Sequence, residues 1–198
     1  MTDYAERLRQ VTLGEPQRVD GHIELADYDV EWPRAFEREA ARIRQALGDR
    51  ALMTEHVGST SVPGLAAKPR VDILLVVADA ADEAAYVPAM EAHGYALRIR
   101  EPDWHEHRLF KGPDIDINLH VFTAGCSEIE RMLKFRDWLR SNPSDRDLYL
   151  AKKRELAARD WEFVQQYADA KGELVEEILA RAGAPPPNLN EVERPATH

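Results

Sequence analysis

The sequence has 198 residues, with 26 lysines and arginines against 36 aspartates and glutamates, and a formal net charge of −10 at pH 7. Nucleic-acid binding needs a basic face to neutralise phosphates, so this charge argues against nucleic acid as a partner. An apolar leader and a long uncharged run are both absent from the sequence. We therefore expect a cytoplasmic protein without a membrane partner. Cys126 is the only cysteine, which excludes an intramolecular disulfide and a four-cysteine zinc site.

Hydrophobic periodicity predicts an α/β (α+β) fold, in which a mixed sheet is flanked by helices. Apolar residues recur every three or four positions from Trp32 to a stop at Gly48, which is typical of an amphipathic helix. The run 70–77 is apolar on both faces except at Asp72, which indicates a central strand covered on both sides. The predicted strands are 22–25, 52–57, 70–77, 95–99, 107–111 and 114–122, and the predicted helices are 32–47, 81–93, one ending near Asn142, 145–160 and 162–182.

The length fits one domain, which we expect to cover residues 21–182 and to be helical from about 126. Residues 1–20 are charged and lack a clear apolar period, so they predict an arm or a short helix. Residues 183–198 are rich in proline and polar side chains, which predicts a flexible tail.

The segment 56–77, HVGSTSVPGLAAKPRVDILLVV, carries the strongest functional signal. A Gly-Ser turn at Gly58 and Ser59 lets backbone N–H groups approach a phosphate without a Cβ in the way. Asp72, on the strand that follows, can hold a divalent cation against that phosphate. We expect His56 to support the loop. The hydroxyls that could assist phosphate binding are those of Ser59, Thr60 and Ser61.

A second group of polar residues lies on the segment 114–121, DIDINLHV. Strand side chains alternate, so its four polar residues should share one face while the apolar ones face the core. A solvated sheet surface would show the same alternation, and the pattern by itself leaves both interpretations open. The four polar residues are Asp114, Asp116, Asn118 and His120.

Positive charge for a triphosphate must come from outside the glycine loop. Lys68 ends this loop, and Arg108 offers a planar fork suited to phosphate, so these two are the preferred candidates. The acidic and histidine-rich segment 101–107 does not gather its side chains at strand or helix spacing, and we expect a loop there. The remaining basic candidates are Arg70, Lys111, Arg131, Arg136, Lys152 and Lys153.

These motifs resemble the GrpB family of the nucleotidyltransferase superfamily. The likeness covers roughly residues 20–182 and is carried by HVGSTSVPGLAAKP at 56–69, HRLFKGP at 107–113, NLHVF at 118–122 and FRDWLRSNPSD at 135–145. It implies a nucleotidyltransferase-like sheet and a site in which Asp72 and Asp116 hold Mg²⁺ or Mn²⁺. The place of a further carboxylate in that pattern is occupied by Leu74, so one metal ion or none is expected.

The resemblance suggests transfer of a nucleotidyl group from a nucleoside triphosphate to a small-molecule acceptor. Gly58 and Ser59 would hold the triphosphate, and Asp72 with Asp116 would hold the metal. His120 would ligate the metal or accept the acceptor's proton. Two other hypotheses remain open: a nucleotide- or metabolite-binding module without catalysis, and another anion-dependent enzyme, such as a ligase or hydrolase.

Overall fold

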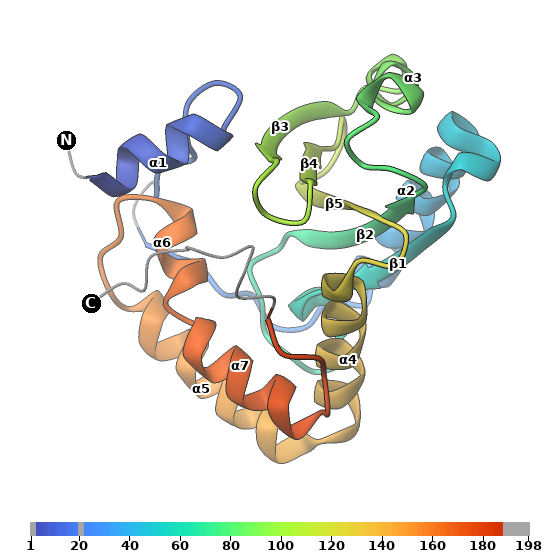
Figure 1. Ribbon diagram of the computed structural model, residues 1–198. Coiled ribbons are helices and arrows are strands. Elements are labelled where there is room, and N and C mark those ends of the chain that lie inside the picture. Colours follow the sequence, from blue (N-terminus) through green and yellow to red (C-terminus); the bar gives the residue numbers. More distant parts are fainter. Residues whose placement is uncertain (1–2, 20–21, 188–198) are drawn as a thin grey trace.

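A five-stranded mixed sheet with the strand order β1-β2-β5-β4-β3 forms the centre of the molecule (Figure 1). The structure, a computed structural model, describes residues 3–19 and 22–187. The strands are β1 (Met53–Val57), β2 (Val71–Val77), β3 (Ala96–Glu101), β4 (His107–Lys111) and β5 (Ile117–Thr123). The helices are α1 (Asp3–Val11), α2 (Glu31–Leu47), α3 (Val87–Ala92), α4 (Ser127–Ser141), α5 (Pro143–Ala157), α6 (Val164–Asp169) and α7 (Gly172–Arg181).

The two central strands, β2 and β5, run parallel, while the other neighbouring strands pair antiparallel. Helices α2 and α3 supply apolar side chains to one face of the sheet, where Ile43 and Met90 are fully buried with Ile73 and Leu119 of the central strands. The opposite face of β2 presents Leu74 and Val76, which pack with residues of α4. Both faces of β2 are therefore covered, as its apolar sequence predicts, and the α/β fold is confirmed.

The helical third of the chain forms a layer beside the sheet, in which α4, α5 and α7 lie together (Figure 1). Leu139, Tyr149 and Ile178 come from these three helices and bury Val62 and Leu65, which follow the glycine loop. The helices thus hold the loop from one side. Within the described part of the chain, no helix has the length and hydropathy to cross a membrane.

Several predicted boundaries differ from the structure. Residues 22–25 form no strand, and a single bridge joins Ala26 to Ala67 instead. The last predicted strand starts at Ile117 rather than at 114. The helix predicted over 81–93 shortens to α3, with a proline in its first turn, and the one over 162–182 divides into α6 and α7.

The predicted arm contains helix α1, and Thr12 bridges to Ile99 of the edge strand β3. Most of the predicted tail, residues 188–198, falls outside the described residues, as do residues 1–2 and 20–21.

Candidate functional site

Gly58 lies directly against Asp72, where β1 ends opposite the start of β2. Its φ of 67° and ψ of −170° belong to a region that only glycine adopts readily. A Cβ built at Gly58 would lie 2.4 Å from Oδ2 of Asp72 and 2.9 Å from its Cβ. The predicted approach of a phosphate to the backbone of this turn stays a prediction. The group that occupies the space in this structure is the Asp72 side chain.

The loop after Gly58 is held by its own side chains and by β1. Nε2 of His56 lies 3.0 Å from Oγ1 of Thr60, and Oγ of Ser61 donates a 2.6 Å hydrogen bond to the carbonyl of Gly58. Thr60 and Ser61 are 1% and 4% exposed. These two hydroxyls are thus used inside the loop, which corrects the prediction that they assist a ligand. Burial lowers the pKa of His56 to about 4, so His56 supports the loop as a neutral imidazole.

Asp72 is tied to the neighbouring strand β5 by two side chains. Nδ2 of Asn118 donates a 2.9 Å hydrogen bond to Oδ1 of Asp72, and Nε2 of His120 lies 3.8 Å from the same oxygen. Burial acts to raise the pKa of Asp72, but the contacts with His120 and Asn118 and the charge of Arg70 outweigh it and lower the pKa overall. Asp72 is therefore ionised at neutral pH.

His120 is oriented in turn by a second histidine that sequence patterns did not assign to the site. Its Nδ1 lies 3.1 Å from Nε2 of His107 on β4, and the rings stack at 23°. Nδ1 of His107 lies 2.7 Å from Oε2 of Glu101. Residues 102–106 between these two form turns, as the loop prediction required, while Glu101 and His107 face each other as a strand pair. This chain of contacts fixes which ring nitrogen of His120 faces Asp72.

Asp116 directly precedes β5, the strand beside β2, so it is not on that strand as expected, and its carboxylate is held by two cations. Arg70 Nε donates to Oδ2 at 2.8 Å and Lys111 Nζ donates to Oδ1 at 3.1 Å. Lys111 also donates to Oδ1 of Asn118 at 2.7 Å. An ammonium group therefore occupies the position between Asp116 and the Asp72–Asn118 pair, where a shared metal ion was expected.

The side chains present do not fit a divalent cation. Both Asp116 oxygens and the Asn118 oxygen already accept hydrogen bonds from Arg70 or Lys111. Leu74, in the place of a further carboxylate, is fully buried beneath α4. Across residues 3–19 and 22–187, no group of three His, Cys, Asp or Glu side chains is arranged to hold a metal ion. The ligand set predicted from Asp72, Asp116 and His120 is thus not assembled.

Three lysines from distant segments lie close to Asp72, and we call Lys68, Lys153 and Lys171 the lysine cluster. Burial lowers the pKa of Lys68 to about 8 and those of Lys153 and Lys171 to about 7. The charge of Lys68 further lowers the pKa of Lys153 and Lys171, while the charge of Asp72 raises the pKa of all three lysines. Asp72 is the carboxylate that acts on all three, and Asp116 and Asp169 each act on one more weakly, so burial still outweighs the carboxylate charges and favours binding of a further anion.

The helical layer positions the lysine cluster around Tyr167 and the glycine loop. Lys153 Nζ donates a 2.5 Å hydrogen bond to the carbonyl of Ala66, and Lys171 Nζ lies 4.0 Å from the centre of the Tyr167 ring. Lys68 Nζ lies 5.1 Å from the same ring. Tyr149 of α5 contacts the side chain of Ser59, which links this layer to the Gly-Ser turn.

Two of the predicted residues lie away from this site. Arg108 is on the sheet face that packs against α2 and α3, because it pairs with Val121, and its Nε donates a 2.7 Å hydrogen bond to Glu83. Arg108 therefore does not face the site, which corrects the expectation that it contacts a phosphate there. Asp114 precedes the strand and forms an ion pair with Arg42 of α2.

All but one of the basic residues that were predicted on the helices as phosphate-binding candidates form ion pairs elsewhere. Arg131 bonds to Glu128 and Glu176, Arg136 bonds to Glu55, and Lys152 pairs with Glu155. Lys153 alone of the predicted helical candidates joins the lysine cluster, while Lys171 was missed because nothing in its local sequence marks it.

Comparison with known proteins places this chain in a family. The family model described as GrpB protein matches residues 22–181. A UPF0157 protein of Halalkalibacterium halodurans is 63% identical over 90% of this chain and 92% of its own length. A crystal structure of the conserved protein GrpB from Enterococcus faecalis superposes with a TM-score of 0.71 and 32% identity, covering 80% of this chain and 96% of that one.

A protein named dephospho-CoA kinase, from Mycolicibacterium paratuberculosis, is 30% identical over 81% of this chain. The match covers 46% of that protein. The activity in its name is therefore not assigned to this chain.

Proposed function

Because the chain belongs to the GrpB family and gathers three buried or half-buried lysines beside its glycine loop, we propose that it binds a nucleoside triphosphate or a similar small polyphosphate. The lysine cluster carries this proposal. An ammonium group with a depressed pKa is a poorly compensated charge, and a bound phosphate would compensate it. Lys68, Lys153 and Lys171 would provide the donors, with the Ser59 turn beside them.

In this proposal Asp72 has a positioning role. Its carboxylate partly neutralises the lysines while the site is empty, and it packs against Gly58 so closely that only a glycine fits there. Metal ligands are not needed, because the cations that would offset the phosphate charge are protein side chains. The protein would then act as a nucleotide-binding module.

Nucleotidyl transfer to a small-molecule acceptor is the second candidate. The observation that favours it is the placement of an ionised aspartate, oriented by Asn118 and His120, against a Gly-Ser turn. Release of pyrophosphate from ATP in the presence of candidate acceptors distinguishes transfer from binding alone. Release of inorganic phosphate would instead indicate a hydrolase or ligase.

Calorimetric titration of ATP, with a chelator present to remove divalent ions, tests the first proposal. Each lysine that donates to a phosphate is expected to contribute about tenfold or more to affinity, so Lys171→Met should weaken binding by that factor. Lys152→Met is the matched control, since Lys152 is on α5 next to Lys153 but pairs with Glu155. Absence of metal-free ATP binding by the unaltered protein, or equal losses in the two variants, would contradict the proposal.

A further inference from the structure

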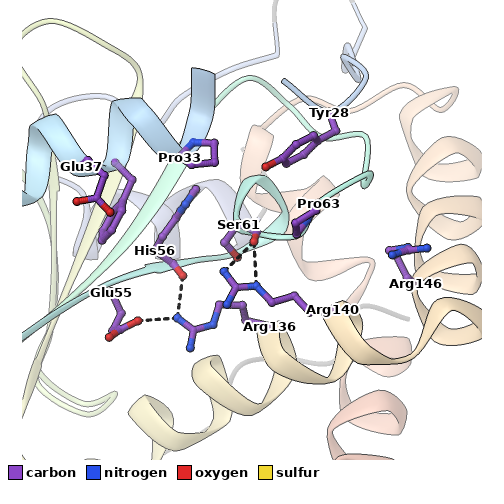
Figure 2. A pocket seen from close by; sticks show the side chains of 11 residues that line it. Tyr28, Pro33, Glu37, Glu55, His56, Ser61, Pro63, Arg136, Arg140 and Arg146 are labelled. Atoms are coloured by element: carbon purple, nitrogen blue, oxygen red, sulfur yellow. Dashed lines mark hydrogen bonds and ion pairs between the residues drawn. The ribbon is translucent and has the colours of Figure 1, made fainter. Parts of the chain in front are cut away.

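A pocket lies beside the glycine loop, against the face of the sheet that α2 covers. Its volume is about 450 Å³, within the usual range for small-molecule sites. Figure 2 shows the side chains that line it, from α2 and the segment before it, β1, the glycine loop, α4 and α5. None of the lysine cluster is among them. We call it the arginine pocket, because Arg136, Arg140 and Arg146 line it.

Two of the three arginines are used to hold the protein together. Arg136 Nη1 donates to Oε2 of Glu55 at 2.7 Å and to the carbonyl of His56 at 3.0 Å. Arg140 donates through Nε and Nη2 to the carbonyl of Ser61, at 3.0 and 2.9 Å (Figure 2). Burial and the charge of Arg136 lower the pKa of Arg140. Oδ1 of Asp137 already accepts hydrogen bonds from both guanidinium groups, from Arg136 Nε at 2.8 Å and from Arg140 Nη1 at 3.4 Å.

Arg146 differs from the other two because its guanidinium is left without a partner. It forms no hydrogen bond or ion pair with any of the residues that the structure describes, although it lines the pocket and is half-buried. An arginine in a concave site presents a planar fork of donors that matches a carboxylate or a phosphate. The free group in this pocket is thus an anion-binding group.

The carboxylates of the pocket do not neutralise Arg146. Glu55 is paired with Arg136 at 2.7 Å. Glu37 is exposed on α2, and Figure 2 shows it at the opposite end of the pocket from Arg146. His56 has a pKa lowered to about 4 by burial, so it adds no charge at neutral pH. Arg136 and Arg140 are paired with acidic side chains, so the uncompensated positive charge at the end formed by α4 and α5 is that of Arg146.

The remaining wall of the pocket is apolar and aromatic. Tyr28, Pro33, Phe36 and Pro63 line it, and Phe36 stacks on the His56 ring with a centroid distance of 5.0 Å and an interplanar angle of 11°. Such a wall accommodates the ring or apolar body of a ligand and does not suit a hydrated inorganic ion.

We propose that the arginine pocket binds a small organic anion, in which a carboxylate or phosphate on an aromatic or apolar body contacts Arg146. The apolar body lies between Tyr28 and Phe36. This site is distinct from the lysine cluster and does not depend on nucleotide binding there.

Fluorine NMR with para-fluorobenzoate, para-fluorophenyl phosphate and para-fluorobenzylamine as probes tests the proposal. The two anions should broaden on addition of the full-length protein, whereas the amine of similar size should not. Replacing a charge-assisted donor should weaken anion binding by about fivefold or more in Arg146→Met. Arg154→Met is the matched control, because Arg154 is exposed on the same helix and does not line the pocket.

The variant Lys171→Met separates the two sites. Binding of the aromatic anions should persist within about twofold in this variant, since Lys171 does not line the arginine pocket. Preference for benzoate over phenyl phosphate, or the reverse, identifies the anionic group. The proposal is overturned if neither anion binds, if the amine binds as well as the anions, or if Lys171→Met abolishes binding while Arg146→Met does not.

Discussion

The contact between Gly58 and Asp72 predicts a specific energetic coupling. Gly58→Ala should cost about 1–3 kcal/mol of the free energy of unfolding from the positive φ alone. The added Cβ would also lie 2.4 Å from Oδ2 of Asp72, so Asp72 must rotate and leave Asn118. Loss of that hydrogen bond adds about 1–3 kcal/mol. We therefore expect a total of about 2–6 kcal/mol.

A double-mutant cycle separates these two contributions. Asp72→Gly removes all three atoms closest to the added Cβ, so Gly58→Ala should cost only the conformational part in that background. Gly48→Ala is the control, because Gly48 has φ of 56° and nothing within 4 Å of an added Cβ. Urea unfolding followed by tryptophan fluorescence measures each free energy. An equal cost of Gly58→Ala in both backgrounds would refute the claim that Asp72 requires this glycine.

Two other predictions concern charged groups. Arg108→Met should lower the free energy of unfolding by about 1–3 kcal/mol, because the buried guanidinium bonds to Glu83, and should leave ATP affinity unchanged in calorimetry. A fall in ATP affinity at unchanged stability would contradict this prediction and would indicate that Arg108 contacts the nucleotide. For pH, Lys153 and Lys171 lose their protons near pH 7 in the folded state, whereas unfolded lysines keep theirs to about 10.5. The unfolded state thus binds more protons, so the free energy of unfolding should rise as pH increases above 7. Urea titrations at several pH values should show a smaller rise for Lys153→Met. A stability that falls over this range would contradict the lowered pKa values.

The glycine loop and Asp72 could be predicted from the sequence because they are close along the chain and have distinctive residue types. The apolar run of β2 also predicted correctly that this strand is central in the sheet. Asn118 and His120 could be placed on one face by strand alternation, and they do reach Asp72. Alternation failed at Asp114, because β5 begins only at Ile117.

The rest of the site depends on how distant segments pack. Alternation along β4 separates Arg108 from Lys111, but it does not say which of the two faces the site, and the structure places Lys111 there. Lys171 follows α6 and has no local pattern that marks a ligand. The charge of Asp72 acts on it only because the helical layer folds back over the glycine loop, so its role becomes visible only in three dimensions.

The most direct test of the lysine cluster is the number of protons taken up when ATP binds. At pH 8 lysines with a pKa of about 7 are largely neutral, and a phosphate beside them should raise the pKa of both Lys153 and Lys171. Calorimetry in two buffers with different ionisation enthalpies, with a chelator present, measures this uptake. We predict uptake of about one to two protons per ATP, reduced in Lys153→Met. Binding without proton uptake, or with proton release, would contradict the account.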